Sequence, residues 1–220
     1  MDTTYFGRKF GVMVFMDSFT GQVLYKGYVK NETNALYRVL CTQYKYLRGI
    51  AEIFRRGISV QSIICDGRKG IFEMFPDIPC QLCQFHQVKT ITRYLTQKPK
   101  LEAAIELRSL ALQLTKINKE SFIRLLQMWK NKWDKFLNER SISATTGKSF
   151  YTHKRLRSAY FSLKRNIPYL FVFQDYKELA IPNTTNMLDG TFADLKNKLR
   201  NHNGLNMTRK QKFIEEFFKA

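Results

Sequence analysis

The sequence predicts an α/β protein in which a mixed sheet is combined with a large all-helical insertion. In the first 86 residues, apolar runs and helical patterns alternate in the order β-β-α-β-α-β. Apolar residues then recur at helical spacing over residues 87–180, and two further amphipathic helices fill residues 181–220. These three stretches are the expected first part of an α/β core, the insertion, and the closing helices.

Turn and cap residues mark the limits of the expected elements. The turn-rich stretch 17–21 separates two apolar runs and predicts a hairpin. The cap residues at 183–186 precede a helix that ends near Gly204, and a last short helix is expected over 210–219. The elements expected in the first 86 residues are strands over 10–16 and 23–29, a helix over 36–54, a strand over 58–65, a short helix over 70–75 and a strand over 78–85.

The charge of the chain indicates a polyanionic partner, and nucleic acid is favoured over a generally basic surface or a ribosome-associated role. Lys and Arg number 37 against 18 Asp and Glu, which gives a net charge of +19. Between Glu139 and Asp175 there is no acidic residue, so this window predicts a phosphate-facing surface, with a solvated helix face as the alternative. We expect no signal peptide and no membrane span, and the four cysteines then predict reduced thiols in the cytoplasm.

Three carboxylates stand where a metal site for phosphoryl transfer could form. Asp2 precedes the hairpin, Asp66 ends an apolar strand, and Asp189 lies in the first turn of a late helix. Such acids can converge beside two Mg²⁺ ions. Each also has a structural alternative: a frayed terminus for Asp2, a turn for Asp66, and a helix cap for Asp189.

Two further patterns have a structural and a functional interpretation. Cys80, Cys83 and His86 are zinc-ligand types, but structural zinc takes four ligands and these positions do not share one face of a strand. A structural contact between Cys83 and His86 is therefore favoured. Trp129 and Trp133 share a helix face, which predicts core packing, with stacking on an unpaired DNA base as the alternative.

Four motifs occur in a fixed order along the chain: Asp2-Thr-Thr-Tyr-Phe-Gly-Arg, Ile64-Cys-Asp66-Gly, Cys83-Gln-Phe-His86 and Thr185-Asn-Met-Leu-Asp189-Gly-Thr-Phe-Ala-Asp-Leu-Lys196. Together they resemble the catalytic region of bacterial insertion-sequence transposases of the Mutator-like DDE group. The resemblance covers essentially the whole chain, and the C-x-x-H motif is its most group-specific part.

This resemblance implies an RNase H-like fold and a polynucleotidyl transferase that cleaves and joins DNA strands at the ends of a mobile element. Asp2, Asp66 and Asp189 would be its catalytic acids and would hold two Mg²⁺ ions, or Mn²⁺, and zinc is not expected. The implied partner is double-stranded DNA, bound by a homo-oligomer at the bacterial nucleoid. The residues expected to contact DNA are Arg140, Lys148, Lys154, Arg155, Arg157, Lys164, Arg165, Lys196, Lys198 and Arg200.

Two departures from the family pattern leave other functions open. Position 189 carries Asp where the family usually has Glu. The chain also begins one residue before the first acid, so a truncated first strand and the lack of the family's upstream DNA-binding region are expected. The alternatives are an inactive remnant that binds DNA or a partner, and an RNase H-type nuclease without strand transfer.

Overall fold

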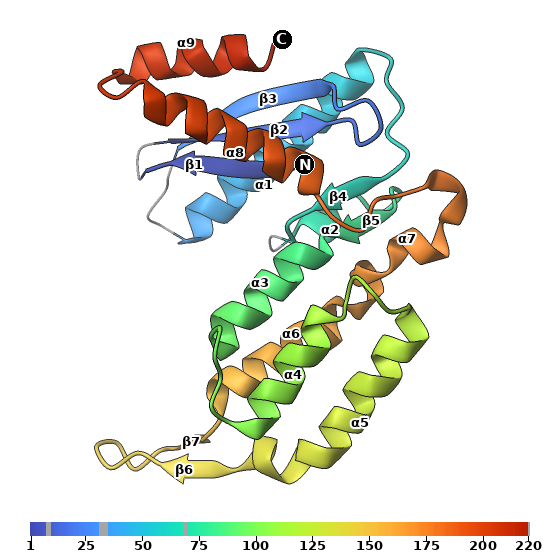
Figure 1. Ribbon diagram of the computed structural model, residues 1–220, viewed down its shortest axis with the longest axis vertical. Coiled ribbons are helices and arrows are strands. Elements are labelled where there is room, and N and C mark those ends of the chain that lie inside the picture. Colours follow the sequence, from blue (N-terminus) through green and yellow to red (C-terminus); the bar gives the residue numbers. More distant parts are fainter. Residues whose placement is uncertain (8–9, 31–34, 68–69, 220) are drawn as a thin grey trace. The chain divides into compact units, whose positions relative to one another are not determined.

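The computed structural model describes residues 1–7, 10–30, 35–67 and 70–219 (Figure 1). The chain forms two compact units. Unit 1 consists of residues 1–79 and 185–220, and unit 2 consists of residues 80–184. The sequence predicted the corresponding divisions after residue 86 and after residue 180. Each unit is mixed in composition, with helices and small sheets.

Unit 1 is built on a three-stranded antiparallel sheet in the order β1-β2-β3. The strands are β1 (Asp2–Phe6), β2 (Phe10–Met16) and β3 (Val23–Lys30). Asp2 is opposite Val14 in the register of β1 and β2. The hairpin of β2 and β3 was predicted, whereas the order expected from periodicity omitted β1. Its Thr-Thr-Tyr-Phe residues favour a strand through pairing with β2, and they show no alternation of apolar and polar positions.

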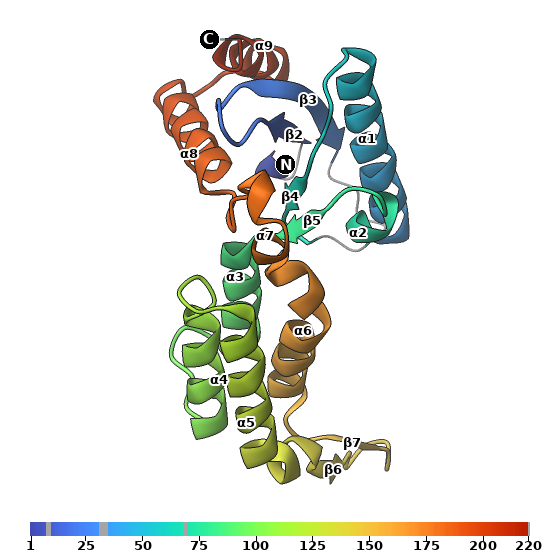
Figure 2. The same ribbon diagram turned by 90° about the vertical axis from the view of Figure 1, so that its right-hand side faces the viewer.

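Helices cover both faces of this sheet (Figure 2). On one side, Phe15 of β2 packs against Tyr46 of α1 (Ala35–Arg55), with ring centroids 5.9 Å apart. On the other side, Val12 and Val14 form a buried cluster with Leu188, Phe192 and Leu195 of α8 (Asn186–Asn201). The alternation of neighbouring β2 residues between the two helices follows from the two-residue period of a strand.

The remaining elements of unit 1 are short or lie at its end. They are β4 (Ile63–Cys65), α2 (Ile71–Met74) and α9 (Met207–Phe217). The Asn206 side chain caps α9 by accepting a hydrogen bond from the Arg209 amide at 2.9 Å. The predicted strand over 58–65 was too long, because only its last three residues form a strand.

Unit 2 is mainly helical and contains a second, isolated hairpin. Its elements are β5 (Cys80–Leu82), α3 (Gln84–Leu95), α4 (Glu102–Leu112), α5 (Lys119–Asn138), β6 (Arg140–Ile142), β7 (Ser149–Tyr151), α6 (Lys154–Leu170), α7 (Val172–Asp175) and the 3₁₀ helix η1 (Lys177–Leu179).

The hairpin of β6 and β7 corrects the prediction of an all-helical insertion. It occupies the break that the sequence placed at 141–147, where Gly147 takes a φ of +64°. Ser and Thr residues in this stretch favour turns over a continuing helix.

The strand predicted over 78–85 was also wrong at its end. The carbonyl of Cys83 accepts a hydrogen bond from the amide of Gln87 at 3.1 Å, so the chain is already helical there. Cys83 precedes α3 as its N-cap residue, and His86 lies in the first turn of α3. The C-x-x-H motif therefore spans the start of a helix and does not lie on a strand.

Candidate active site

The first acid, Asp2, is fixed in the interior of unit 1. Only 6% of its surface is exposed, so it is not a frayed terminal residue. Its Oδ1 accepts a hydrogen bond from the Thr3 amide at 2.6 Å. The nitrogen of Met1 donates to the carbonyl of Ile64 at 2.6 Å, which ties the start of β1 to β4. The Asp2 side chain faces α8, as does that of its cross-strand partner Val14.

The third acid, Asp189, lies in the first turn of α8 and is half-buried. The buried stripe of α8, which includes Leu188 and Phe192, docks on β2 and sets the position of the helix. The hydroxyl of Thr185 donates to Oδ2 of Asp189 at 2.9 Å, and the Asp189 amide donates to the carbonyl of Thr185. Both bonds lie at the helix N-terminus, where the helix dipole favours a negative charge.

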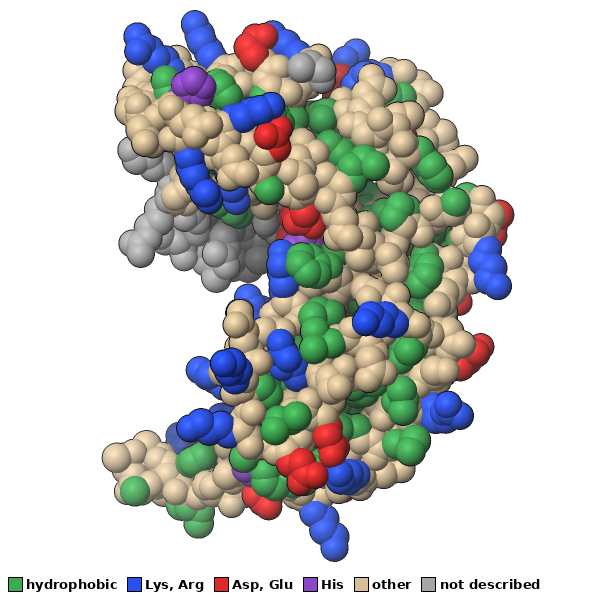
Figure 3. All heavy atoms as spheres, viewed as in Figure 1, with side chains coloured by type: hydrophobic (Ala, Val, Ile, Leu, Met, Phe, Trp, Pro, Cys, Tyr) green, Lys and Arg blue, Asp and Glu red, His purple; other side chains and the backbone are tan. Residues whose placement is uncertain are grey.

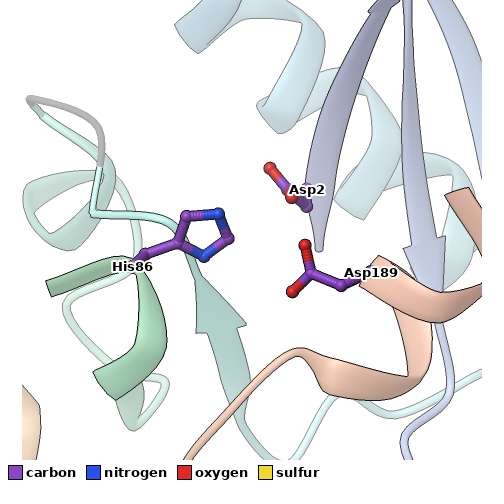
Figure 4. A group of neighbouring side chains, drawn as sticks. All are labelled: Asp2, His86 and Asp189. Atoms are coloured by element: carbon purple, nitrogen blue, oxygen red, sulfur yellow. The ribbon is translucent and has the colours of Figure 1, made fainter. Parts of the chain in front are cut away.

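Asp2 and Asp189 come together in unit 1 (Figure 4). A carboxylate oxygen of Asp2 lies within 4.8 Å of one of Asp189. Figure 4 also labels His86, which belongs to unit 2. The two carboxylates arise from opposite ends of the chain, and they form a pair of hard oxygen donors of the kind that Mg²⁺ and Mn²⁺ prefer.

This pair opens onto a cavity of about 340 Å³ within unit 1. Besides Asp2 and Asp189, the cavity is lined by Lys196 and Arg200. These cations lie about two and three helical turns beyond Asp189 on α8. The cavity therefore combines two acids with two basic side chains along one helix face. That combination suits a metal-bound phosphodiester, because the acids take the ion and the cations face the phosphate charge.

The second predicted acid, Asp66, follows the last residue of β4 and is half-buried. It is not part of the ligand group that contains Asp2 and Asp189 in the described part of the chain. The hydrogen bond from Met1 to Ile64 nevertheless holds its strand beside the residue that precedes Asp2. The structure thus brings the first and third predicted acids together and leaves the second one outside this pair, directly after β4.

Cys80, Cys83 and His86 all belong to unit 2. Cys80 lies in β5 and Cys83 at the start of α3, and both are buried. Burial raises the pKa of the Cys80 thiol to about 11, which keeps the thiol protonated at neutral pH.

The basic residues expected to contact DNA fall into two groups. Lys196, Lys198 and Arg200 lie on α8, and the other seven lie on β6, on α6 and in the turn between β6 and β7. Lys198 pairs with Asp194 at 3.1 Å. The Arg157 guanidinium donates to the Leu137 carbonyl at 2.9 Å, so it caps the end of α5. The remaining members, apart from half-buried Lys196, are exposed.

The two tryptophans are held by neighbouring helices of unit 2. Trp129 is buried, stacks on Tyr160 at 5.6 Å, and donates its indole N–H to the carbonyl of Ala103 at 3.0 Å. The half-buried Trp133 donates to Glu106 at 2.7 Å. Core packing therefore describes Trp129, and the base-stacking alternative fails for it because its ring is enclosed.

Sequence reasoning missed Thr185 as the partner of Asp189. The signal was present, because positions 185 and 189 are four residues apart at a helix start and so share a face. A cap pattern by itself predicts hydrogen bonds to backbone amides, whereas in the structure the Thr185 hydroxyl donates to a carboxylate.

A scan of protein-family models and searches of curated proteins and of solved structures found no match for this chain. No helix in the described ranges combines the length and the apolar character needed to cross a membrane.

Proposed function

We propose that this chain is the catalytic domain of a DDE-type transposase with an RNase H-like core, which cleaves and joins DNA strands. The observation that carries the proposal is the pair of Asp2 and Asp189 in a cavity whose wall also holds Lys196 and Arg200. The net charge of +19 and the resemblance of the four motifs support DNA as the substrate.

The residues present fit a divalent ion. Carboxylate oxygens are hard ligands, and two of them converge where the helix start and the strand start meet. Asp2 and Asp189 would hold the ion, and Asp66, which directly follows β4, would be the remaining catalytic acid. Mg²⁺ or Mn²⁺ bound there supplies Lewis-acid activation of the attacking and leaving oxygens of a phosphodiester.

The chain's own groups have distinct tasks in this reaction. The Thr185 hydroxyl and the Thr3 amide orient the two carboxylates, so the ligand geometry is set before the ion binds. Lys196 and Arg200 attract and orient the DNA backbone in the cavity.

A nicking assay on supercoiled plasmid with Mg²⁺ or Mn²⁺ tests the proposal. We expect Asp189→Asn and Asp2→Asn to lower the rate about a hundredfold or more, because misplacing a catalytic group by an ångström already costs that much. Asp194→Asn is the matched control, since Asp194 is an exposed acid on the same helix that pairs with Lys198. Cleavage followed by joining supports a transposase, whereas cleavage alone supports a nuclease.

Loss of the same magnitude in Asp194→Asn would contradict the assigned site. A wild-type chain that binds plasmid and never nicks it, with Asp189→Asn binding equally well, would support the inactive remnant instead. Binding of Mn²⁺ measured by calorimetry gives a second readout, and it should weaken in Asp189→Asn and stay unchanged in Asp194→Asn.

A further inference from the structure

The hairpin of β6 and β7 is a defined arm at the end of unit 2. It projects beyond the helices that carry it (Figures 1 and 2). Its turn is closed by the Ser143 amide, which donates to the Lys148 carbonyl at 3.0 Å, and by the Gly147 amide, which donates to the Ser143 carbonyl at 2.9 Å. The hydroxyls of Ser141 and Thr152 add a cross-strand hydrogen bond of 2.7 Å.

Aromatic and cationic side chains fix the base of this arm to the helices. The Tyr151 ring has the Arg157 guanidinium 3.6 Å from its centroid and the Arg140 guanidinium at 4.6 Å. His153 stacks on Phe136 of α5 at 3.7 Å. An isolated hairpin is at best marginally stable in water, so these contacts hold the arm in place.

The arm and the adjoining helix α6 carry basic side chains and no acidic ones of their own, and the one acid at the base of the arm, Glu139, pairs with His153 at 2.8 Å. No acidic residue occurs from position 140 to position 174. The space-filling view shows Lys and Arg side chains, with some Asp and Glu among them, over the helices next to the arm, and a few apolar side chains on the arm itself (Figure 3). The exposed cations of this surface are Arg140, Lys148, Lys154, Arg155, Lys164 and Arg165. A surface of this kind favours a phosphate backbone.

One apolar side chain stands out on the arm. Ile142 is 74% exposed, the highest value among the large apolar side chains of the described residues. It is opposite Ser149 in the hairpin register, and Arg140 on the same face donates to the Ser149 hydroxyl at 2.8 Å. Ile142 therefore adds nothing to the core, and it stands beside a guanidinium on a narrow ribbon.

We propose that this arm enters the minor groove of duplex DNA and that Ile142 wedges against a base step. The choice of duplex DNA rests on the proposed function. Proteins that bend DNA insert apolar side chains, isoleucine among them, between base steps from the minor groove. Arg140 and Lys148 would then contact the phosphates that border the groove.

The test of the wedge is DNA bending by the full chain. A short duplex carries donor and acceptor dyes at its two ends, and energy transfer reports the bend. We expect Ile142→Ala to abolish the bend and to weaken binding about tenfold. This loss corresponds to about half of the free energy of transfer from water of the three side-chain carbons that the substitution removes. The matched control is Ile105→Ala, since Ile105 is an exposed isoleucine of α4 with 49% exposure.

The test of the phosphate contacts is the salt dependence of binding. Lys148→Ala should lower the slope of log affinity against log salt by about one, which corresponds to one phosphate contact. Lys116→Ala is the control, because Lys116 is exposed in unit 2 and lies outside the acid-free window. Equal slopes for the two variants would overturn the assigned contact.

The outcomes separate this proposal from the proposed function. If bending depends on Ile142 in a chain that never nicks DNA, the result supports the proposed role of the arm and contradicts the proposed transposase activity. If the chain nicks DNA while the Ile142→Ala and Ile105→Ala variants bend DNA equally, the result supports the proposed transposase activity and overturns the proposed role of the arm. Preference for duplex RNA or for single strands over duplex DNA also overturns the arm, since those substrates lack the B-form minor groove.

Discussion

Replacing Gln84 with Leu should destabilise unit 2 by removing a buried polar link between its two ends. Gln84 is fully buried at the start of α3. Its Nε2 donates to the carbonyl of Leu170 at 2.9 Å, and its Oε1 accepts from the Asn183 side chain at 3.0 Å. The link therefore joins the segment where the chain enters unit 2 to the segment where it leaves.

The expected loss is about 3–4 kcal/mol in the free energy of unfolding. Leucine nearly preserves the side-chain volume, so the cavity contribution is small. Two hydrogen bonds are lost at about 1 kcal/mol each, and the Asn183 amide loses its acceptor at a further cost of about 1–2 kcal/mol. The Leu170 carbonyl keeps a hydrogen bond from Gln81 at 3.0 Å, which limits the effect on that side.

Urea unfolding followed by tryptophan fluorescence measures this change directly. The chain has 2 tryptophans, Trp129 and Trp133, and both lie in unit 2. Gln127→Leu is the control, because Gln127 is exposed on α5 and bonds only locally to Asn131 at 2.8 Å. If the two variants shift the transition equally, the buried amides contribute no specific stability and the reasoning is refuted.

Three other predictions concern unit 2. Trp129→Ala should cost about 3–5 kcal/mol by circular dichroism in urea, well above the cost of Trp133→Ala, and equal losses would place both rings in the core. A hydrogen bond from Lys132, and to a lesser extent one from Trp133, lowers the pKa of Glu106. The Glu106 carboxylate therefore stabilises the fold at pH values above its ordinary pKa, and this stabilisation is lost as the pH falls through the lowered pKa. Glu106→Gln should flatten that acid limb in a pH series of unfolding curves. The Cys80 thiol, with its pKa raised to about 11, should react with iodoacetamide only after unfolding. Rapid alkylation of Cys80 in the native chain at neutral pH, located by peptide mass spectrometry, would contradict its burial.

Elements that bury one continuous stripe were predictable from the sequence. Helices α1, α5 and α8 repeat apolar residues at helical spacing, and the hairpin of β2 and β3 has a turn between apolar runs. Periodicity failed to predict the strand β1, which was expected only in truncated form from the family resemblance, and the hairpin of β6 and β7, for a common reason. Both are rich in Ser, Thr and aromatic residues, and their strand state depends on a partner strand more than on a local pattern.

The candidate site shows where local patterns stop being sufficient. Asp2 and Asp189 were each identified from sequence, and their proximity follows from a chain of tertiary contacts. Asp2 is opposite Val14, Val14 packs in the cluster that contains Leu188, and Asp189 directly follows Leu188. No periodicity in the sequence predicts the docking of α8 on β2 that completes this series of contacts. The same contacts imply that the carboxylate pair depends on the apolar cluster beneath it. A smaller side chain at position 188 in place of Leu188 would loosen the start of α8 and separate the two acids, although neither acid had been substituted.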